Sequence, residues 1–322
     1  MVCLCLGACQ DPLALETDSV AVFDQLWQEV DQHYAFFDRQ DLDWEAMYAH
    51  YRPMITAGTS EDSLFAVASA LLSELQDPHT VVFTNKGVGG PVDYFSRFPV
   101  NALDDLSGYF NTYQEVNRAL AYGRIGDYGY LKICTFEAVA ADFEAMTEVL
   151  DALAGMQGLI IDVRGNRGGY ISNAKRTLAH FVPTTALVAQ YRHRNGPYHA
   201  DFSAWQDFSL EPNVDLGFNP NLPIAVLTNR QCYSACEWFV LGARSLANVH
   251  VVGDTTGGGS GIPMLRELPN GWLLRVSNSQ FEPHIDFQFK GIYPDFPVWI
   301  STEDARQGRD AILESAIELL KH

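Results

Sequence analysis

The stretch that decides the fold is GLIIDVRGNRGG, residues 158–169. Its first half is a run of branched apolar residues, which indicates a buried strand. Its second half is polar and ends in Gly168 and Gly169, where the chain turns before a helical pattern at about 172–182. Glycines in such a turn permit positive φ and let backbone N–H groups approach a ligand or an anion. The stretch therefore predicts a strand–turn–helix unit of a layered α/β protein, with Asp162 and Arg164 as a structural ion pair.

The same alternation of short apolar strands and helical stretches continues through the second part of the chain. Further strands are expected at 128–133, 224–228 and 249–252, and further helices at 138–153, 234–246 and 310–321. No GxxxxGK[ST] or GxGxxG pattern accompanies them, so the sequence does not favour a nucleotide-binding loop.

The first part of the chain has a different pattern, because apolar residues recur there at helical spacing between residues 20 and 75. Thr59 and Asp62 fit a capping box for the last of these helices. Glycines and a proline at 87–91 then mark a boundary. We expect three parts: a signal remnant or disordered tail at 1–18, a helical subdomain at 19–87, and a larger α/β domain at 88–322.

Composition excludes several classes of protein. The 322 residues carry a formal charge of −19, and such an acidic surface repels phosphate backbones, so a nucleic-acid binder is not expected. Six cysteines are too few for a disulfide scaffold. Cys232 and Cys236 fit buried thiols or a local disulfide, and no second ligand pair suggests a metal site. Cys134 follows an apolar run and is expected in the core.

Three further cysteines lie in the first ten residues, MVCLCLGACQ. The segment ending in Cys9 has an apolar residue and two small residues before the cysteine, the pattern of an acylated bacterial lipoprotein. A lipid anchor on Cys9 would attach the protein to a membrane surface without spanning it. The alternative is a disordered cytosolic tail.

A second segment that could carry catalytic chemistry is LTNRQCYSACEW, residues 227–238. A strand ends there and a helix begins, which places Ser234 at a helix N-terminus. The positive end of the helix dipole favours an alkoxide, and the N–H of Ala235 lacks an intrahelical partner. This arrangement suits a nucleophilic serine, although an ordinary N-cap serine would have the same sequence.

Two other segments supply candidate partners. His79 lies in LQDPHT, just after the last N-terminal helix, and would serve as a base only if the fold brought it to Ser234. The glycines of GDTTGGGSG, residues 253–261, predict a flexible loop, which is either a substrate-side lid or a hairpin connection.

These segments, together with KGIYPD at 290–295, occur in one order and resemble the family of C-terminal processing (tail-specific) serine peptidases. The likeness is greatest to the branch of the tricorn core and interphotoreceptor retinoid-binding protein, which lacks a PDZ domain. The resemblance covers nearly the whole chain. It implies a helical N-terminal subdomain, a ββα spiral core of the ClpP/crotonase type, and peptidase activity that needs no cofactor or metal.

Carried over residue by residue, the family's nucleophile falls on Ser234, and its oxyanion hole on the N–H of Ala235 and of Gly168 or Gly169. No lysine lies between Ser234 and Lys290, so the Ser–Lys dyad of one branch is absent from its usual place. His79 matches the base of the other branch. The position of the family's orienting glutamate is Gln288, and the substitutes are Glu282, Asp286 and Glu237.

The sequence therefore predicts acyl transfer on peptides or unfolded proteins at a bacterial cell envelope, with Ser234 as nucleophile and His79 as base. The missing glutamate motivates an alternative, a non-catalytic ligand- or peptide-binding protein on the same scaffold. Acyl-CoA chemistry would rest on fold analogy alone.

Overall fold

The computed structural model describes residues 18–213, 219, 221–282 and 286–321, and these residues form two compact units. The first unit contains the described residues up to Val92 together with the segments 196–201 and 263–277. The second contains the remaining described residues. A single linear boundary at 87/88 does not describe this division, because two later segments return to the first unit.

The first unit combines helices with an antiparallel sheet. Its helices are α1 (Ser19–His33), α2 (Trp44–Tyr51) and α3 (Glu61–Glu74), with 3₁₀ turns η1 (Phe37–Arg39) and η2 (Arg52–Met54). The sheet has the order β11-β12-β1-β2, with bounds Pro263–Glu267, Leu273–Ser277, Val81–Thr84 and Gly87–Gly89. The predicted cap of α3 was wrong by one residue, since Ser60 accepts the N–H of Ser63 and Thr59 instead accepts that of Thr56.

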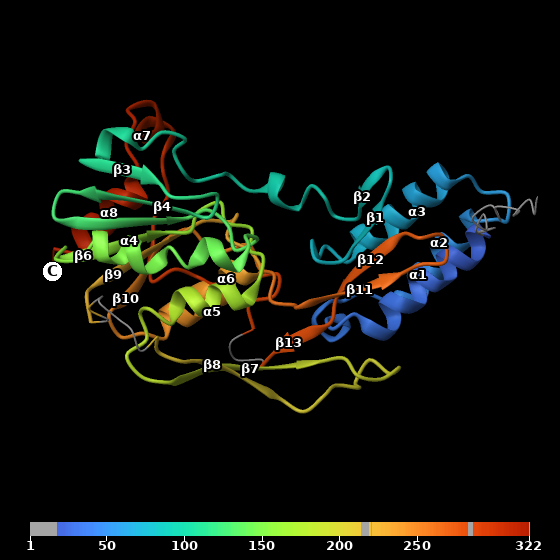
Figure 1. The fold of residues 1–322 in the computed structure, drawn as a ribbon. Coiled ribbons are helices and arrows are strands. Elements are labelled where there is room, and N and C mark those ends of the chain that lie inside the picture. Colours follow the sequence, from blue (N-terminus) through green and yellow to red (C-terminus); the bar gives the residue numbers. More distant parts are fainter. Residues whose placement is uncertain (1–17, 214–218, 220, 283–285, 322) are drawn as a thin grey trace, which may run out of the picture. The chain divides into compact units, whose positions relative to one another are not determined.

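The second unit is built on a mixed sheet in the order β14-β10-β9-β6-β5-β4-β3, of which Figure 1 labels β10, β9, β6, β4 and β3. Strands β14 (Phe296–Pro297), β10 (Val249–Gly253), β9 (Ile224–Thr228), β6 (Gly158–Asp162) and β5 (Tyr128–Ile133) run parallel, whereas β4 (Leu120–Ile125) and β3 (Thr112–Glu115) are antiparallel. A smaller sheet, β13-β7-β8, has the bounds Ser279–Phe281, Ala186–His193 and Gln206–Leu210.

Helices cover both faces of the large sheet, because its strands are apolar on both sides. Leu159 and Ile161 of β6 face a core that includes α4 (Met146–Ala152), α5 (Ile171–Leu178) and α6 (Ala235–Arg244). Ile160, between them, faces α8 (Ala311–Leu319). The remaining short elements are η3 (Tyr94–Arg97), η4 (Ser107–Tyr109), η5 (Ala140–Phe143) and α7 (Thr302–Arg306).

The α/β prediction, with N-terminal helices followed by a strand-rich layer, is confirmed by this architecture. The strands at 128–133 and 224–228 have the predicted bounds. The single helix expected at 138–153 was wrong, since η5 and α4 divide that stretch. Cys134 was also wrongly assigned to the core: β5 ends at Ile133, and the thiol that follows is exposed. The ClpP/crotonase spiral stays a prediction.

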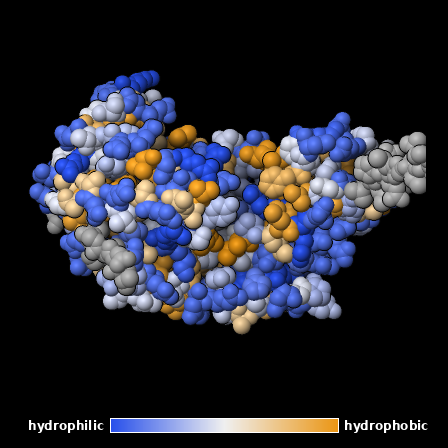
Figure 2. All heavy atoms as spheres, viewed as in Figure 1, coloured by the Kyte–Doolittle hydropathy of each residue, from blue (hydrophilic) through white to orange (hydrophobic). Residues whose placement is uncertain are grey.

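Polar side chains dominate the surface in the view of Figure 2, where apolar residues form only small groups. Among the described residues, no helix combines the length and the apolar character that crossing a bilayer requires.

Candidate functional site

Ser234 lies in the tight turn between β9 and α6 of the second unit, and its backbone is strained. Its φ of 57° and ψ of −125° place a non-glycine residue outside the usual regions. Such strain costs about 1–3 kcal/mol and is found where the surrounding structure fixes a functional group. The next residue, Ala235, is the first of the helix, and its N–H donates to no acceptor among the described residues. The turn thus presents a hydroxyl beside an unused backbone donor.

The glycine turn after β6 packs directly against this serine. Gly168 has a φ of +93°, and a Cβ added there would lie 2.6 Å from the carbonyl oxygen of Tyr233 and 2.8 Å from Cβ of Ser234. Only glycine permits this contact. The carbonyl of Asn166 accepts the N–H of Tyr233 at 3.1 Å, so the two turns are also joined by a hydrogen bond.

The second backbone donor of the site can be assigned within this turn. The N–H of Gly168 donates to Oδ1 of the buried Asn166 at 2.9 Å, so it is already engaged. The N–H of Gly169 donates to no acceptor among the residues that the structure describes. Of the predicted pair, Gly169 is therefore the amide available to an oxyanion, together with Ala235.

Glu237, one turn into α6, is fully buried behind Ser234 and accepts four hydrogen bonds. Its Oε1 accepts the hydroxyl of Thr256 at 2.5 Å and the N–H of Gly258 at 2.7 Å. Its Oε2 accepts the N–H of Ser234 at 3.1 Å and of Gly259 at 2.7 Å. One carboxylate thus connects the Ser234 turn to the glycine loop, residues 253–261.

These contacts define what Glu237 does in the site. Burial raises its pKa to about 7, although the four donors oppose the shift. A carboxylate has about four lone-pair positions, and in Glu237 all are occupied, which leaves none for an imidazole. Glu237 therefore positions Ser234 and the loop, and it has no acceptor left for the orienting role considered from the sequence.

Gln288 holds the other half of the glycine loop. Its Oε1 accepts the N–H of Ser260 at 2.7 Å and of Gly261 at 3.3 Å. The consecutive amides 258–261 are thus bound to two buried side chains, Glu237 and Gln288. Nε2 of Gln288 is buried with no hydrogen-bond partner among the described residues. This unpaired amide nitrogen can only donate, whereas a group that orients a basic imidazole must accept a hydrogen bond from Nδ1–H.

The two remaining candidates for an orienting group have local contacts of their own. Glu282 Oε1 accepts the N–H of Gln190 in β7 at 2.9 Å, beside the small sheet. Asp286 Oδ1 accepts the N–H of Gln288 at 3.2 Å, which closes the turn before the glutamine. The identity of the orienting group thus stays a prediction.

His79 belongs to the first unit, where a buried turn fixes its backbone. Asp77, which is fully buried, accepts the N–H of His79 at 3.0 Å and the hydroxyl of Thr80 at 3.2 Å. From β12, Nε of Arg275 donates to the carbonyl of His79 at 3.0 Å, and a second guanidinium nitrogen donates to that of Pro78 at 2.9 Å. Asp77 thus binds the donors of this turn, and Arg275 binds its carbonyl oxygens.

The same surroundings keep the His79 imidazole neutral. Burial lowers its pKa to about 3, and the positive charge of Arg275 acts in the same direction. At neutral pH the ring is therefore uncharged, and its low pKa makes it a weak base. An imidazolium formed there would be costly in isolation, so a nearby oxyanion would be needed to stabilise it.

Sequence reasoning missed Arg275, Asn166 and Thr256. Arg275 is 196 positions from His79, and only strand pairing brings it close. For Asn166 and Thr256, the only signal in the sequence was that each is a polar residue inside a glycine-rich motif, at 158–169 and 253–261 respectively. Cys232 and Cys236 are buried free thiols, and Cys9 lies outside the described residues.

Comparison with known proteins gives matches in both units. The model of peptidase family S41 matches residues 127–298, slightly more than half of the chain. The tricorn protease C1 domain matches residues 18–73.

Among individual proteins, a crystal structure of a proposed peptidase from Parabacteroides merdae ATCC 43184 is 32% identical. It has a TM-score of 0.84, and the match covers 94% of this chain and 97% of that one. The tricorn protease, 14% identical with a TM-score of 0.64 over 95% of this chain and 37% of its own, shares the fold.

The carboxy-terminal processing protease CtpB of Bacillus subtilis (strain 168) is 34% identical over 131 residues, 40% of this chain and a quarter of its own length. The chain thus spans well under two thirds of that curated relative. The family model and the structural match agree: this chain belongs to peptidase family S41.

Proposed function

We propose that this protein is a serine peptidase in which Ser234 is the nucleophile, His79 the general base, and the amides of Ala235 and Gly169 the oxyanion hole. The observation that carries the proposal is the strained Ser234 turn, with one unused N–H beside it and another on the adjoining glycine turn. The mechanism requires His79, from the first unit, to come within hydrogen-bond reach of Ser234 Oγ.

The reaction is acyl transfer to water. Ser234 Oγ attacks the scissile carbonyl carbon while His79 removes its proton, and the oxyanion accepts hydrogen bonds from the two amides. The tetrahedral intermediate then expels the amine, which takes the proton from His79. Water hydrolyses the acyl-enzyme by the same steps. One oxyanion donor contributes about 10²–10³ to the rate, and both donors of this site are backbone groups that the folded turns hold in place.

Peptides and unfolded chains are the proposed substrates, and hydrolysis of an unstructured protein such as casein tests this. The wild-type chain should produce fragments, and the Ser234→Ala variant should produce none above background. Ser245→Ala is a matched control that should retain activity, because Ser245 caps the opposite end of α6. Equal hydrolysis by wild type and Ser234→Ala would exclude Ser234 as the nucleophile.

A non-catalytic binding protein is the second candidate, and Gln288 is the observation that favours it. An amide stands where the family has a glutamate, and its unused end is a donor. Gln288→Glu distinguishes the two functions. A peptidase should retain or gain activity with the carboxylate, whereas a binding protein should hydrolyse nothing in either form and still bind peptides.

For location we propose the bacterial cell envelope, with Cys9 acylated. The support is the lipoprotein-like sequence before Cys9. Expression of the full chain and of Cys9→Ser in a bacterial host tests this location. Recovery of the wild-type chain in the membrane fraction and of the variant in the soluble fraction is expected, and equal recovery of both in the soluble fraction would refute the anchor.

A further inference from the structure

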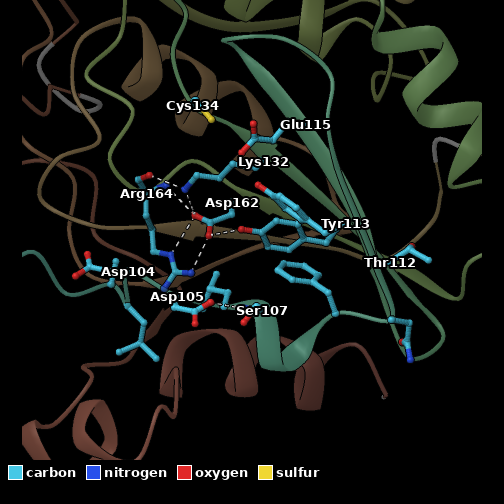
Figure 3. Close-up of a pocket in the computed structure, with 16 residues that line it drawn as sticks. Asp104, Asp105, Ser107, Thr112, Tyr113, Glu115, Lys132, Cys134, Asp162 and Arg164 are labelled. Carbon is cyan, nitrogen blue, oxygen red and sulfur yellow. Dashed lines mark hydrogen bonds and ion pairs between the residues drawn. The ribbon is translucent and has the colours of Figure 1, made fainter.

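The second unit contains a cavity of about 550 Å³ that the proposed chemistry does not use. It lies between the loop before β3 and the ends of β5 and β6 (Figure 3). Three aromatic rings line one side: Phe110 packs 4.8 Å from Tyr113 and 4.9 Å from Tyr130, measured between ring centroids. Tyr113 is 48% exposed, so part of this aromatic wall is open to a ligand.

The floor of the cavity is a buried ion-pair cluster that is electrically neutral. Arg164 contacts Asp162 and Asp310 at 2.7 Å each, and Lys132 lies 3.2 Å from Asp162. Figure 3 shows Arg164 and Lys132 both directed at Asp162. Although burial opposes ionisation, the two cations hold the pKa of Asp162 well below its usual range. Two positive and two negative side chains therefore cancel.

The remaining charges of the lining are all negative. Asp104, Asp105 and Glu115 line the cavity, and none of them has a cationic partner among the described residues. Asp105 accepts the N–H of Ser107 at 2.8 Å, which lowers its pKa and keeps it ionised. Asp104 and Glu115 lie on opposite sides of the Asp162 cluster in Figure 3. With the floor neutral, the cavity carries a net negative charge.

Two titratable groups of the lining have raised pKa values, and burial is the largest cause of each shift. Burial raises the pKa of the Tyr113 hydroxyl, and Glu115 and Asp162 raise it further. Burial also raises the pKa of the Cys134 thiol, and the same two carboxylates act in the same direction against Lys132. Glu115 and Asp162 thus add to the cost of a negative charge at these two groups.

We propose that this cavity binds the cationic side chain of a lysine or arginine residue in a peptide, between the aromatic wall and the carboxylates Asp104 and Glu115. Aromatic faces and carboxylates both attract organic cations. The described residues contain no group of three or more side chains arranged to hold a metal ion, which favours an organic cation over an inorganic one. The identification of the ligand as a peptide rests on the proposed function.

Cys134 provides a reporter of occupancy that does not depend on catalysis, because it lines the cavity and the residue is partly accessible to solvent. The full chain carrying Ser234→Ala is alkylated with iodoacetamide, and the rate at Cys134 is followed by peptide mass spectrometry. End-blocked peptides that differ only in a central lysine, norleucine or glutamate are the probes. The lysine peptide should slow alkylation saturably, with an affinity about fivefold or more above that of norleucine.

The double variant Asp104→Asn/Glu115→Gln should abolish this preference. Glu148→Gln/Asp151→Asn removes the same charge from exposed positions of α4 and should preserve it. The preference should also weaken as salt is raised, because screening acts on exposed charges. Equal protection by lysine and norleucine, no protection by any peptide, or an unchanged preference in the cavity variant would each overturn the proposal.

Hydrolysis of casein by the wild-type chain is measured in parallel. If the lysine preference holds but nothing is hydrolysed, the peptidase proposal fails and the binding site stands. If hydrolysis occurs with no protection of Cys134, the cavity proposal fails and the peptidase stands.

Discussion

Replacing Glu237 by glutamine tests how the nucleophile turn is held. The carboxylate is fully buried and its pKa is raised from 4.5 to about 7. A carboxyl group whose pKa is higher in the folded than in the unfolded state stabilises the fold at low pH, and this contribution is lost as pH rises through the folded value. Lowering the pH from 8 to 5 crosses the folded-state value, so it should stabilise the wild-type fold by roughly 2–3 kcal/mol through this group alone.

The glutamine variant cannot titrate, so it lacks that gain. Its single oxygen can satisfy only part of the four donors, and each buried donor left without an acceptor costs about 1–3 kcal/mol. That cost is the same at both pH values. The stability difference between wild type and variant should therefore be larger at pH 5 than at pH 8 by roughly 2–3 kcal/mol.

Native-state hydrogen exchange of the segment 256–261 is the assay, because Glu237 binds two of its amides. Both proteins carry Ser234→Ala to prevent self-digestion, and this change leaves the bonded N–H of residue 234 in place. Comparison of the two proteins at one pH cancels the intrinsic exchange chemistry. A difference that is equal at pH 5 and pH 8, or larger at pH 8, would refute the raised pKa.

Three further substitutions probe other parts of the structure. Gly168→Ala adds a Cβ 2.6 Å from a backbone oxygen and should reduce fluorophosphonate labelling of Ser234 by about 10² or more. In the control Gly155→Ala, the added Cβ meets nothing within 4 Å and should cost only backbone strain. Equal labelling rates in the two variants would contradict the packing argument. Arg275→Gln should lower kcat about tenfold and, because the cation no longer lowers the pKa of His79, should move the acidic limb of the pH–rate profile to higher pH. Arg266→Gln, on the neighbouring strand, should leave the profile unchanged. An unmoved acidic limb in Arg275→Gln would exclude a positioning role for Arg275. Asp310→Asn removes one of the two carboxylates that pair with buried Arg164 and should destabilise the second unit by about 3–5 kcal/mol in thermal unfolding, with activity per folded molecule retained. An unchanged unfolding transition would show that the Arg164–Asp310 pair contributes nothing to stability.

The parts of the fold that the sequence predicted are those governed by local patterns. Strand β6 appears as an apolar run because both of its faces are buried, and the glycines after it announce a turn. Ser234 at a helix N-terminus follows from the same local reasoning. The positive φ of Ser234 could not be read from the sequence, because strain in a non-glycine residue is imposed by tertiary contacts.

The site residues that escaped prediction act through contacts between distant segments. Glu237 appeared from the sequence as one candidate to orient His79, but its four bonds go to the serine turn and the glycine loop. The loop looked flexible because glycines are permissive, yet buried acceptors hold its amides. Arg275 reaches the His79 turn through the pairing of β12 with β1, and strand register is not a local property.

The central claim, that His79 activates Ser234, is tested most directly by the rate of covalent labelling with a fluorophosphonate. Intact-mass measurement at pH 7.5 should show one adduct on the wild-type chain, none on Ser234→Ala, and labelling slowed by about 10² or more on His79→Gln. Labelling of His79→Gln at the wild-type rate, or an adduct on Ser234→Ala, would contradict the account.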